Sequence, residues 1–479
     1  MSSDPARRGG GDRGRVRAAR FRRALAITIT GLVVLVGALA VLGAIAPPRL
    51  SGATINAATA TERPGQRLAM TLSQPVAVDG AVLTVTPAAD AELASDGTTA
   101  TVRFSGMLDY ATEYTVRIEG LRGTATGATG TVETRFTTPD PGAVTLLRGV
   151  DGEPDRVVRS PIDGAEAETI AEADAIGDLA VAGSPSADGT GAGQTVAISV
   201  DDGDGARVRI LVPDAPAVEA HGPYEASIRA LRGTEAGLFG WIISRGVDGE
   251  REYVNTLVVY DLAGESAATN VPVEITGPGG APLLAVDWAW VPGSTSMVVQ
   301  DQDGFTWLAD ATGGEPTLLG TQGTLRGFVP GTAKVLTEEA PDLLLTDLAT
   351  GESSPFGLRQ PAADPDRVPG ESAVIGVDAA AWIVHRLDRT RTPSLVGSSI
   401  VRTDADGDTV LFETAGESSI ILDLCVSPNG QFIAATVAAT ANADADAGAT
   451  APRPTTVLID ARTGGSSRSV PGESISWCG

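Results

Sequence analysis

The chain has few side chains of the types that perform acid–base or nucleophilic catalysis. Its 479 residues include only two histidines, His221 in the segment EAHGPYEAS and His385 directly after the apolar segment AWIV. Neither has a catalytic partner recognisable in the sequence, so we expect a surface or hydrogen-bonded histidine in both places. The chain also lacks a Gly-x-Ser-x-Gly elbow, a Walker-type phosphate loop and a His-Glu-x-x-His pair. We therefore predict a protein that is not an enzyme and has no cofactor.

Carboxylates gather in three short turns that contain glycine: VDDGDG (200–205), DQDG (301–304) and DADGD (404–408). Carboxylates two positions apart on a turn could hold Ca²⁺, but none of the three turns has the spacing of a twelve-residue calcium loop that ends in Glu. Asp-Gly hairpin turns account for all three without a metal ion. We therefore predict no metal site.

Aromatic side chains are the other candidates for ligand contacts. Trp288 and Trp290 alternate with Ala289 on an expected strand, so both share one face. Packing between neighbouring elements is the simpler interpretation, and an aromatic lining of a mouth that binds sugars or peptides is the alternative. For Tyr110 and Tyr114 we expect a core or corner position in which the hydroxyl bonds to the backbone.

The chain has two cysteines, Cys425 and Cys478. Aligning SISWCG (474–479) on LDLCV (422–426) gives the two cysteines the same strand position in neighbouring units. A single pair of cysteines in an exported protein is more often bonded than free. We predict a Cys425–Cys478 disulfide, with two free buried thiols as the alternative.

The elements expected to carry these residues are short strands. Residues 284–319 contain four of them, at 284–290, 295–300, 304–309 and 315–319, separated by turn-forming segments. A repeated four-stranded unit of this length is typical of a β-propeller blade. Small residues precede the first turn of four such units, as expected for innermost strands that crowd round an axis: Ala182, Ala289, Gly327 and Cys425.

Together with this unit, six blades are expected, near 165–215, 225–278, 284–320, 323–360, 370–416 and 418–470. The remaining ends, 143–163 and 471–479, would complete one shared blade, as is common in closed propellers. The sequence thus predicts seven blades over 143–479, with six as the alternative. Residues 437–452 are rich in Ala, Asp and Gly and are expected to form a disordered loop.

The N-terminal third has a different organisation. Residues 63–140 alternate apolar and polar positions, at the strand spacing of a small β-sandwich, after a short linker at 47–62. Residues 24–46 are uncharged and mostly apolar. A helix of that length would span roughly 34 Å, enough to cross a bilayer core of about 30 Å. We predict an uncleaved transmembrane anchor, with a cleaved signal peptide as the alternative.

Charge sets the expected topology and excludes one class of partner. Residues 1–23 hold eight Arg against Asp4 and Asp12, a net +6, so the other residues must carry −31 to reach the total of −25. The basic segment should stay in the cytoplasm, which places the residues after Pro47 outside. A body this acidic repels phosphates, so we predict no nucleic-acid partner.

Two groups of segments resemble known families. MTLSQPV (70–76), ATVRFSGMLDYATEYTVRIEGL (100–121) and RFTTPD (135–140) resemble the bacterial Ig-like domain of S-layer and other surface proteins. The matching residues are Leu108, Tyr114, Thr115, Val116 and Phe136 to Pro139. This resemblance implies a spacer or adhesion-type module without chemistry of its own.

LCVSPNGQFIAATVA (424–438) resembles the first hairpin of the WD40-like propeller repeats of TolB type. Asn429 stands where that pattern usually has Asp, while Gly430, Ile433 and Ala434 fit. The resemblance implies the propeller fold and leaves the function open, because this fold hosts many functions.

The sequence therefore predicts an all-β protein with one N-terminal transmembrane helix, a small Ig-like β-sandwich and a propeller. We expect a single-pass protein of the cell membrane whose extracytoplasmic part binds an envelope protein or a wall polymer. The alternative is an envelope hydrolase or lyase with its active site on a propeller face.

Overall fold

The structure is a computed structural model of the chain. It describes residues 21–36, 46–150, 152–162, 164–183, 194–321, 323–339, 342–357, 359–389, 394–416, 419–439 and 453–478. The chain divides into two compact units. The first holds residues up to 55, 67–103 and 115–135, and the second holds 56–66, 104–114 and everything from 136 onward.

Residues 21–36 are helical, and the large apolar side chains among them are exposed. Most of the predicted basic segment 1–23 and part of the predicted spanning segment 24–46 lie outside the described residues. Within the part of the chain that is described, no helix combines the length and the apolar character needed to cross a membrane.

Two antiparallel sheets follow. One has the strand order β1-β2-β6-β5, and in the other β7 pairs with β3, β4 and β8. Their bounds are β1 (Leu50–Thr54), β2 (Arg67–Leu72), β3 (Val76–Ala77), β4 (Val82–Thr86), β5 (Ala91–Asp96), β6 (Thr99–Phe104), β7 (Glu113–Gly123) and β8 (Thr129–Thr137). Alternate side chains of β2, β6 and β7 are buried, as the period-two pattern predicts. The ring of Phe104 on β6 lies edge-on to that of Phe136 on β8, with 6.1 Å between centroids, which joins the two sheets.

The segment 47–62, interpreted from the sequence as a linker, contains regular structure. β1 pairs with β2, and α2 (Ala57–Glu62) follows. The Thr59 backbone N–H donates to Asn56 Oδ1 at 3.2 Å, so Asn56 caps the helix. Ala58 and Ala60 are buried, which gives this short helix the packing that its length alone does not supply.

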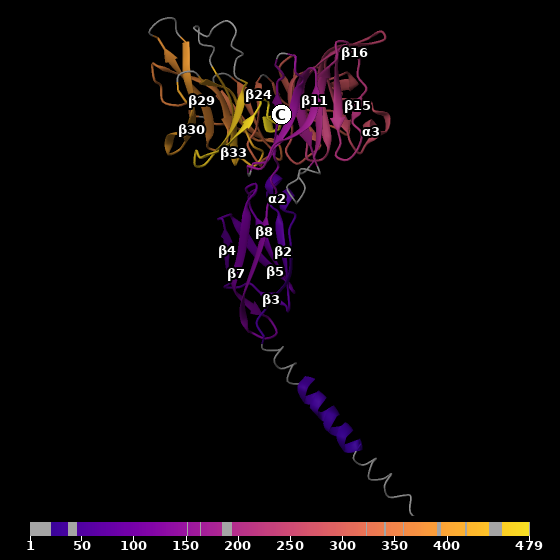
Figure 1. The fold of residues 1–479 in the computed structure, drawn as a ribbon, viewed down its shortest axis with the longest axis vertical. Helices are drawn as coiled ribbons and strands as arrows, with labels where there is room; N and C mark the ends of the chain where they lie inside the picture. The colour runs from indigo at the N-terminus through magenta and orange to yellow at the C-terminus, as the bar shows by residue number, and fades with distance from the viewer. Residues whose placement is uncertain are drawn as a thin grey trace, which may run out of the picture. The chain divides into compact units, whose positions relative to one another are not determined.

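Residues 143–479 form seven antiparallel sheets in the part of the chain that is described. The first contains β9 (Ala143–Leu147), β10 (Asp155–Ser160) and β11 (Glu168–Ala173). Each of the other six has four strands, which pair with one another in chain order. The second and third sheets are β12 (Ile176–Ala182), β13 (Thr195–Asp201), β14 (Ala206–Leu211) and β15 (Val218–Ala220), and then β16 (Tyr224–Gly233), β17 (Leu238–Asp248), β18 (Arg251–Asp261) and β19 (Val273–Glu274). The fourth and fifth sheets are β20 (Ala285–Trp290), β21 (Ser296–Asp301), β22 (Phe305–Asp310) and β23 (Thr317–Thr321), and then β24 (Thr324–Phe328), β25 (Lys334–Glu339), β26 (Asp342–Asp347) and β27 (Ser353–Pro355). The sixth and seventh sheets are β28 (Arg367–Val374), β29 (Ala380–Asp388), β30 (Ser394–Asp404) and β31 (Gly407–Glu413), and then β32 (Ser419–Val426), β33 (Phe432–Ala439), β34 (Thr455–Asp460) and β35 (Ser466–Pro471). Short helices α3 (Glu265–Thr269), η1 (Pro278–Gly280) and η2 (Ser476–Cys478) connect or follow the strands, and α2 lies at one end of these sheets in Figure 1.

The two ends of this region complete one sheet together. The backbone N–H of Leu146 on β9 donates to the carbonyl of Glu473 at 2.8 Å, and the N–H of Glu473 donates back at 2.9 Å. Thr145 Oγ1 also donates to the carbonyl of Pro471 at 2.7 Å. The blade shared between 143–163 and 471–479 therefore forms as the sequence predicts. It also includes β11, which the sequence pattern places in the next blade, because β11 pairs with β10.

The hydrophobic cores lie between neighbouring sheets. Trp288 on β20 is fully buried against Ile242 and Leu257 of the preceding sheet. Gly240 leaves room for it, because a Cβ at that position would lie 2.5 Å from the Trp288 ring. Trp288 thus has the packing role that is the simpler interpretation of the tryptophan pair.

Cys425 lies on β32 and is disulfide-bonded. The side chain of Cys478 lies outside the described residues, as do residues 440–452 of the expected disordered loop, so both of those expectations stay predictions.

A Cys425–Cys478 bond would tie the segment after β35 to β32 and close a loop of about 54 residues, worth about 4 kcal/mol in the loop-entropy model. Cys478→Ser should therefore lower the melting temperature of the full-length protein by several degrees, and reductant should lower that of the wild type equally. Alkylation and peptide mapping without reductant should find no free thiol. Two freely labelled cysteines would contradict the pairing.

Candidate functional site

A cavity of about 420 Å³ lies where the first strands of the sheets converge. Every one of the seven sheets contributes to its wall. The contributing residues include Val144, Val181, Gly233, Trp290, Phe328, Val374 and Cys425. Seven sheets that share one cavity along their first strands have the arrangement of propeller blades round an axis. We call this space the axial cavity.

The small residues singled out from the sequence lie on these inner strands. Ala289, Gly327 and Cys425 line the axial cavity, and Ala182 ends β12 beside it. The prediction that small residues mark the innermost strand is therefore confirmed for Ala289, Gly327 and Cys425.

One end of the axial cavity is capped by residues far away in the sequence. Tyr110, from the loop between β6 and β7, is 5% exposed and lines the cavity together with Glu62 and Arg63 at the end of α2. The Tyr110 ring stacks on Trp477 with 6.4 Å between centroids. Arg63 forms an ion pair with Glu235 at 2.8 Å. We call the loop 107–112 the cap loop.

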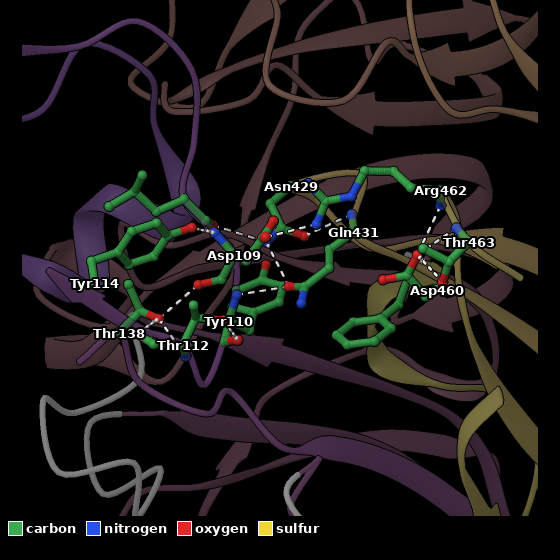
Figure 2. Close-up of polar contacts among 12 residues, drawn as sticks. Asp109, Tyr110, Thr112, Tyr114, Thr138, Asn429, Gln431, Asp460, Arg462 and Thr463 are labelled. Carbon is green, nitrogen blue, oxygen red and sulfur yellow. Dashed lines mark hydrogen bonds and ion pairs between the residues drawn. The ribbon is translucent and has the colours of Figure 1, made fainter. Parts of the chain in front are cut away.

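The cap loop is bound by two turns of the last sheet (Figure 2). The Tyr110 backbone N–H donates to Gln431 Oε1 at 2.7 Å, and Asn429 Nδ2 donates to the carbonyl of Leu108 at 3.1 Å. Arg462 donates to the Asp109 carboxylate at 2.6 Å. These contacts attach the loop to the hairpin turn before β33 and to the turn after β34.

Asn429 stands where the TolB-type pattern usually has Asp, and its contacts give a reason for this difference. Its Oδ1 accepts from Ser427 Oγ at 2.9 Å and from the Gln431 N–H at 3.1 Å, which an aspartate could also do. Its Nδ2 donates to Leu108, which an aspartate could not do. The amide therefore keeps the turn and also binds the cap loop.

Tyr114 fixes the base of the cap loop. The Asp109 N–H donates to Tyr114 Oη at 3.0 Å, and Thr138 Oγ1 donates to the Asp109 carbonyl at 2.6 Å. The Tyr110 hydroxyl is bonded to the Asn429 backbone, and burial raises the pKa of this phenol far above its ordinary value. The predicted core or corner role with a backbone partner is confirmed for both tyrosines.

The other residues singled out from the sequence lie elsewhere. Trp290 lines the axial cavity, while Trp288 is buried between sheets and donates from Nε1 to the carbonyl of Ala230 at 3.1 Å. Neither histidine lines the cavity. His221 is exposed in its loop, with Nδ1 3.2 Å from the carbonyl of Asn270, and His385 Nδ1 lies 2.8 Å from Ser398 Oγ.

The acidic turns have hairpin geometry. Asp201 Oδ1 accepts from the Gly203 N–H at 2.9 Å, Asp301 Oδ1 from the Asp303 N–H at 2.9 Å, and Asp404 Oδ1 from the Asp406 N–H at 2.9 Å. In each turn the first carboxylate therefore binds its own backbone.

Two carboxyls that the sequence does not single out meet on adjacent inner strands. Glu371 on β28 lines the axial cavity and forms a side-chain hydrogen bond with Asp423 on β32. Desolvation, and then the charge and hydrogen bond of Asp423, raise the pKa of Glu371, and the charge of Arg326 partly opposes this.

Backbone bulges put the acids in place. The β28–β29 and β32–β33 registers shift between Pro369 and Ser372 and between Ile421 and Asp423. A bulge re-aims the side chains next to it. The sequence does carry a signal for one of the acids. Asp423 lies five positions before the proline of its hairpin turn, and Asp287 lies five positions before the corresponding proline in another blade.

Charges at other inner strands form pairs of opposite sign. Asp287 on β20 accepts from Arg232 on β16 at 3.1 Å, and Arg148 donates to Glu473 at 2.9 Å and to Asp155 at 3.0 Å. Arg326 donates through Nε to Glu338 of its own sheet at 2.6 Å. The Glu371–Asp423 contact differs from these because both partners are acids.

Replacing Asn429 by Asp should release the cap loop while keeping the turn. The change removes the bond to Leu108 and places a carboxylate oxygen against its carbonyl, a loss of about 1–3 kcal/mol. Hydrogen exchange at the Tyr110 amide should become faster by one to two orders of magnitude. Asn270→Asp is the matched control, because Asn270 Oδ1 only accepts, from Tyr260 at 3.2 Å. Unchanged exchange at Tyr110 would contradict the role of Asn429.

Replacing Glu371 by Gln should change how stability depends on pH. A raised pKa means that the folded chain holds this proton more tightly than the unfolded chain. Folding stability therefore falls as the pH rises from the ordinary glutamate value through the raised value. Glutamine has no such proton, so the melting temperature of Glu371→Gln relative to wild type should increase between pH 4 and pH 8. A difference that is the same at every pH would contradict the raised pKa of Glu371.

No protein-family model and no curated protein matches the chain. Among solved structures it is similar to the C-terminal WD40 domain of Sif2, at 13% identity over 67% of this chain and 78% of that chain, with a TM-score of 0.39. It is similar to TolB from Acinetobacter baumannii at 11% identity, over 83% and 82% of the two chains, with a TM-score of 0.36. A prolyl endopeptidase aligns at 11% identity over 70% of this chain and 50% of its own, with a TM-score of 0.42. Because these TM-scores are low, the propeller assignment rests on the seven sheets and their common cavity.

Proposed function

We propose that this protein is a membrane-anchored binding or scaffold protein of the cell envelope. It recognises another protein or a wall polymer through its propeller, outside the cytoplasm. The observation that carries this proposal is the axial cavity, which has a volume of about 420 Å³ and a wall that combines charged and aromatic side chains. Binding sites for ligands have volumes of this order and a similar mixture of groups.

The wall of the axial cavity is built to keep its shape. Its residues come from the inner strands of all seven sheets, and the two hydrogen bonds between Leu146 and Glu473 close the ring. A site on packed strands binds with little loss of conformational entropy, which suits recognition.

The anchor and the spacer are supported by the sequence. Residues 24–46 carry no charge and follow the arginine-rich segment, which favours a helix that crosses the membrane with its N-terminus in the cytoplasm. Residues 24–36 of this segment are helical, and their large apolar side chains are exposed. The two N-terminal sheets, which resemble the bacterial Ig-like domain in sequence, serve as the spacer.

An envelope hydrolase or lyase is the second candidate, and the Glu371–Asp423 contact favours it. Two neighbouring carboxyls whose environments differ can act as an acid and a base in one site. Glycosidases, however, keep their two carboxyls about 5–9.5 Å apart, wider than a direct hydrogen bond. No histidine is among the residues that line the axial cavity. Binding therefore accounts better for this pair.

The test is a pull-down from native envelope with the full-length protein in mild detergent as bait. The expected result is retention of one protein or of wall polymer by the wild type, and its loss when Trp290 and Phe328 in the cavity wall are both replaced by Ala. Trp307→Ala is the control, because Trp307 is a half-buried tryptophan of the same sheet as Trp290 and does not line the axial cavity. Shortening of retained wall polymer during incubation would favour the hydrolase instead.

A further inference from the structure

A second, smaller pocket lies on the sheet formed by β28, β29, β30 and β31, which is drawn in orange in Figure 1. Its volume is about 50 Å³, and its wall includes Arg367, Arg386, Ser399 and Glu413. None of these four residues lines the axial cavity. We call this space the sheet pocket.

The strand register places the polar side chains of the sheet pocket on one face of the sheet. Arg367 is the cross-strand partner of Arg386, Val384 that of Ser399, and Ser399 that of Glu413. Cross-strand partners share a face, and so do residues two positions apart on one strand. The pocket therefore extends across four strands, with two arginines on one side and a glutamate on the other.

The two arginines have little internal compensation for their charge. Like charges directly opposite each other on neighbouring strands are destabilising. Arg367 Nε lies 3.6 Å from Asp364 Oδ2, and Arg386 Nη2 donates to the carbonyl of Val396 at 3.1 Å. Among the described residues, no ion pair joins either arginine to Glu413. Because a guanidinium has five N–H donors, both arginines keep donors for an anion in the pocket.

Gly397 fixes the position of the Arg386 guanidinium. This glycine lines the pocket and has a φ of +152°, and a Cβ there would lie 3.2 Å from Arg386 Nη2. The missing side chain lets the guanidinium lie over β30, where it bonds to the carbonyl of Val396. A group that is held in place before the ligand arrives loses little conformational entropy on binding.

Ser399 gives the sheet pocket a polar floor between its two charged sides. The residue is 6% exposed, and its hydroxyl donates to the carbonyl of Val384 at 3.4 Å. That is long for an O–H···O bond, which is usually about 2.7–2.8 Å. The hydroxyl can therefore turn to a ligand oxygen at little cost.

Size and charge together restrict the ligand. A volume of about 50 Å³ holds about three to five water-sized groups, at about 10–15 Å³ each. A simple anion would be repelled by Glu413, and a simple cation would be repelled by the two arginines. A small molecule that carries both charges satisfies both sides of the pocket.

We propose that the sheet pocket binds a free α-amino acid with a small side chain, such as glycine or alanine. Arg367 and Arg386 donate to its carboxylate, as does the Ser399 hydroxyl, and its ammonium group donates to Glu413. This inference goes beyond the proposed function and does not depend on it, because the two pockets share none of these residues. The envelope pull-down and the experiment below can therefore fail separately.

The test is a titration of the full-length protein in mild detergent, followed by ligand-observed NMR. The probes are glycine, acetate, methylamine and leucine. We expect saturable binding of glycine and at least tenfold weaker binding of acetate and of methylamine, because each lacks one of the two charges. Leucine should also bind at least tenfold more weakly, because its side chain exceeds the space. Absence of saturable glycine binding, or equal affinity for glycine and any other probe, would overturn the proposal.

Variants assign the two charges of the ligand to the two sides of the pocket. Glu413→Gln should reduce the affinity for glycine to that for acetate and should not weaken acetate, which also shows that the variant is folded. Arg386→Gln should weaken both ligands at least tenfold. Arg245→Gln is the matched control, because Arg245 is an exposed arginine on β17 of another sheet, and it should leave both affinities unchanged.

Two outcomes would contradict this assignment. Unchanged glycine affinity in Glu413→Gln would show that the glutamate does not bind the ammonium group. A loss in Arg245→Gln equal to that in Arg386→Gln would show that the general charge of the protein, and not the sheet pocket, controls the binding.

Discussion

Leu146 and Glu473 hold the propeller closed through two backbone hydrogen bonds, at 2.8 and 2.9 Å. A ring of sheets has one seam, and strands at an open seam would expose unpaired N–H and C=O groups. In this propeller the seam falls inside a sheet, because the segment after β35 pairs with β9, the first strand of the ring. The axial cavity depends on this pairing, since its wall requires all seven sheets to stand round one axis.

The capped end of the cavity shows how one substitution in a repeated motif can create a specific contact. The hairpin turn at 427–431 is a propeller element that needs an oxygen acceptor at position 429, and either Asp or Asn supplies it. The amide nitrogen of Asn429 is the additional group, and it binds Leu108 of the cap loop. Gln431 and Arg462 bind the two residues that follow, so three turn residues of one blade recognise three consecutive residues of the loop.

Much of the fold can be predicted from the sequence because it depends on local patterns. Turn residues and apolar alternation mark the strands, and proline-aligned small residues mark the inner strand of several blades. The pattern places β11 in the wrong blade. Alternation of apolar and polar residues shows that a segment is a strand but does not show which strand it pairs with, and β11 pairs with β10. It also misses the helix α2, although Asn56 is a cap signal, because six residues are too few for a periodic pattern.

The candidate site can be predicted much less well. Trp290 is recognisable from its residue type, and for Tyr110 and Tyr114 the sequence predicts a core or corner position. The contact between Glu371 and Asp423 cannot be found in this way, because it depends on how closely two inner strands approach and on bulges that turn the acids. Likewise, the contact between Tyr110 and Gln431 joins residues 321 positions apart, and nothing local to either residue signals it.

The stack of Tyr110, Trp477 and Phe432 has a consequence for the order in which the chain folds. The Trp477 ring lies 6.4 Å from that of Tyr110 and 6.3 Å from that of Phe432. During synthesis the cap loop is made early, and its aromatic partner Trp477 is added several hundred residues later. Contacts between such distant positions form slowly, since the loop that must close is long. The aromatic stack therefore forms after the other contacts of the cap loop have become possible, and a nascent chain that stops short of Trp477 leaves Tyr110 without the ring on which it stacks.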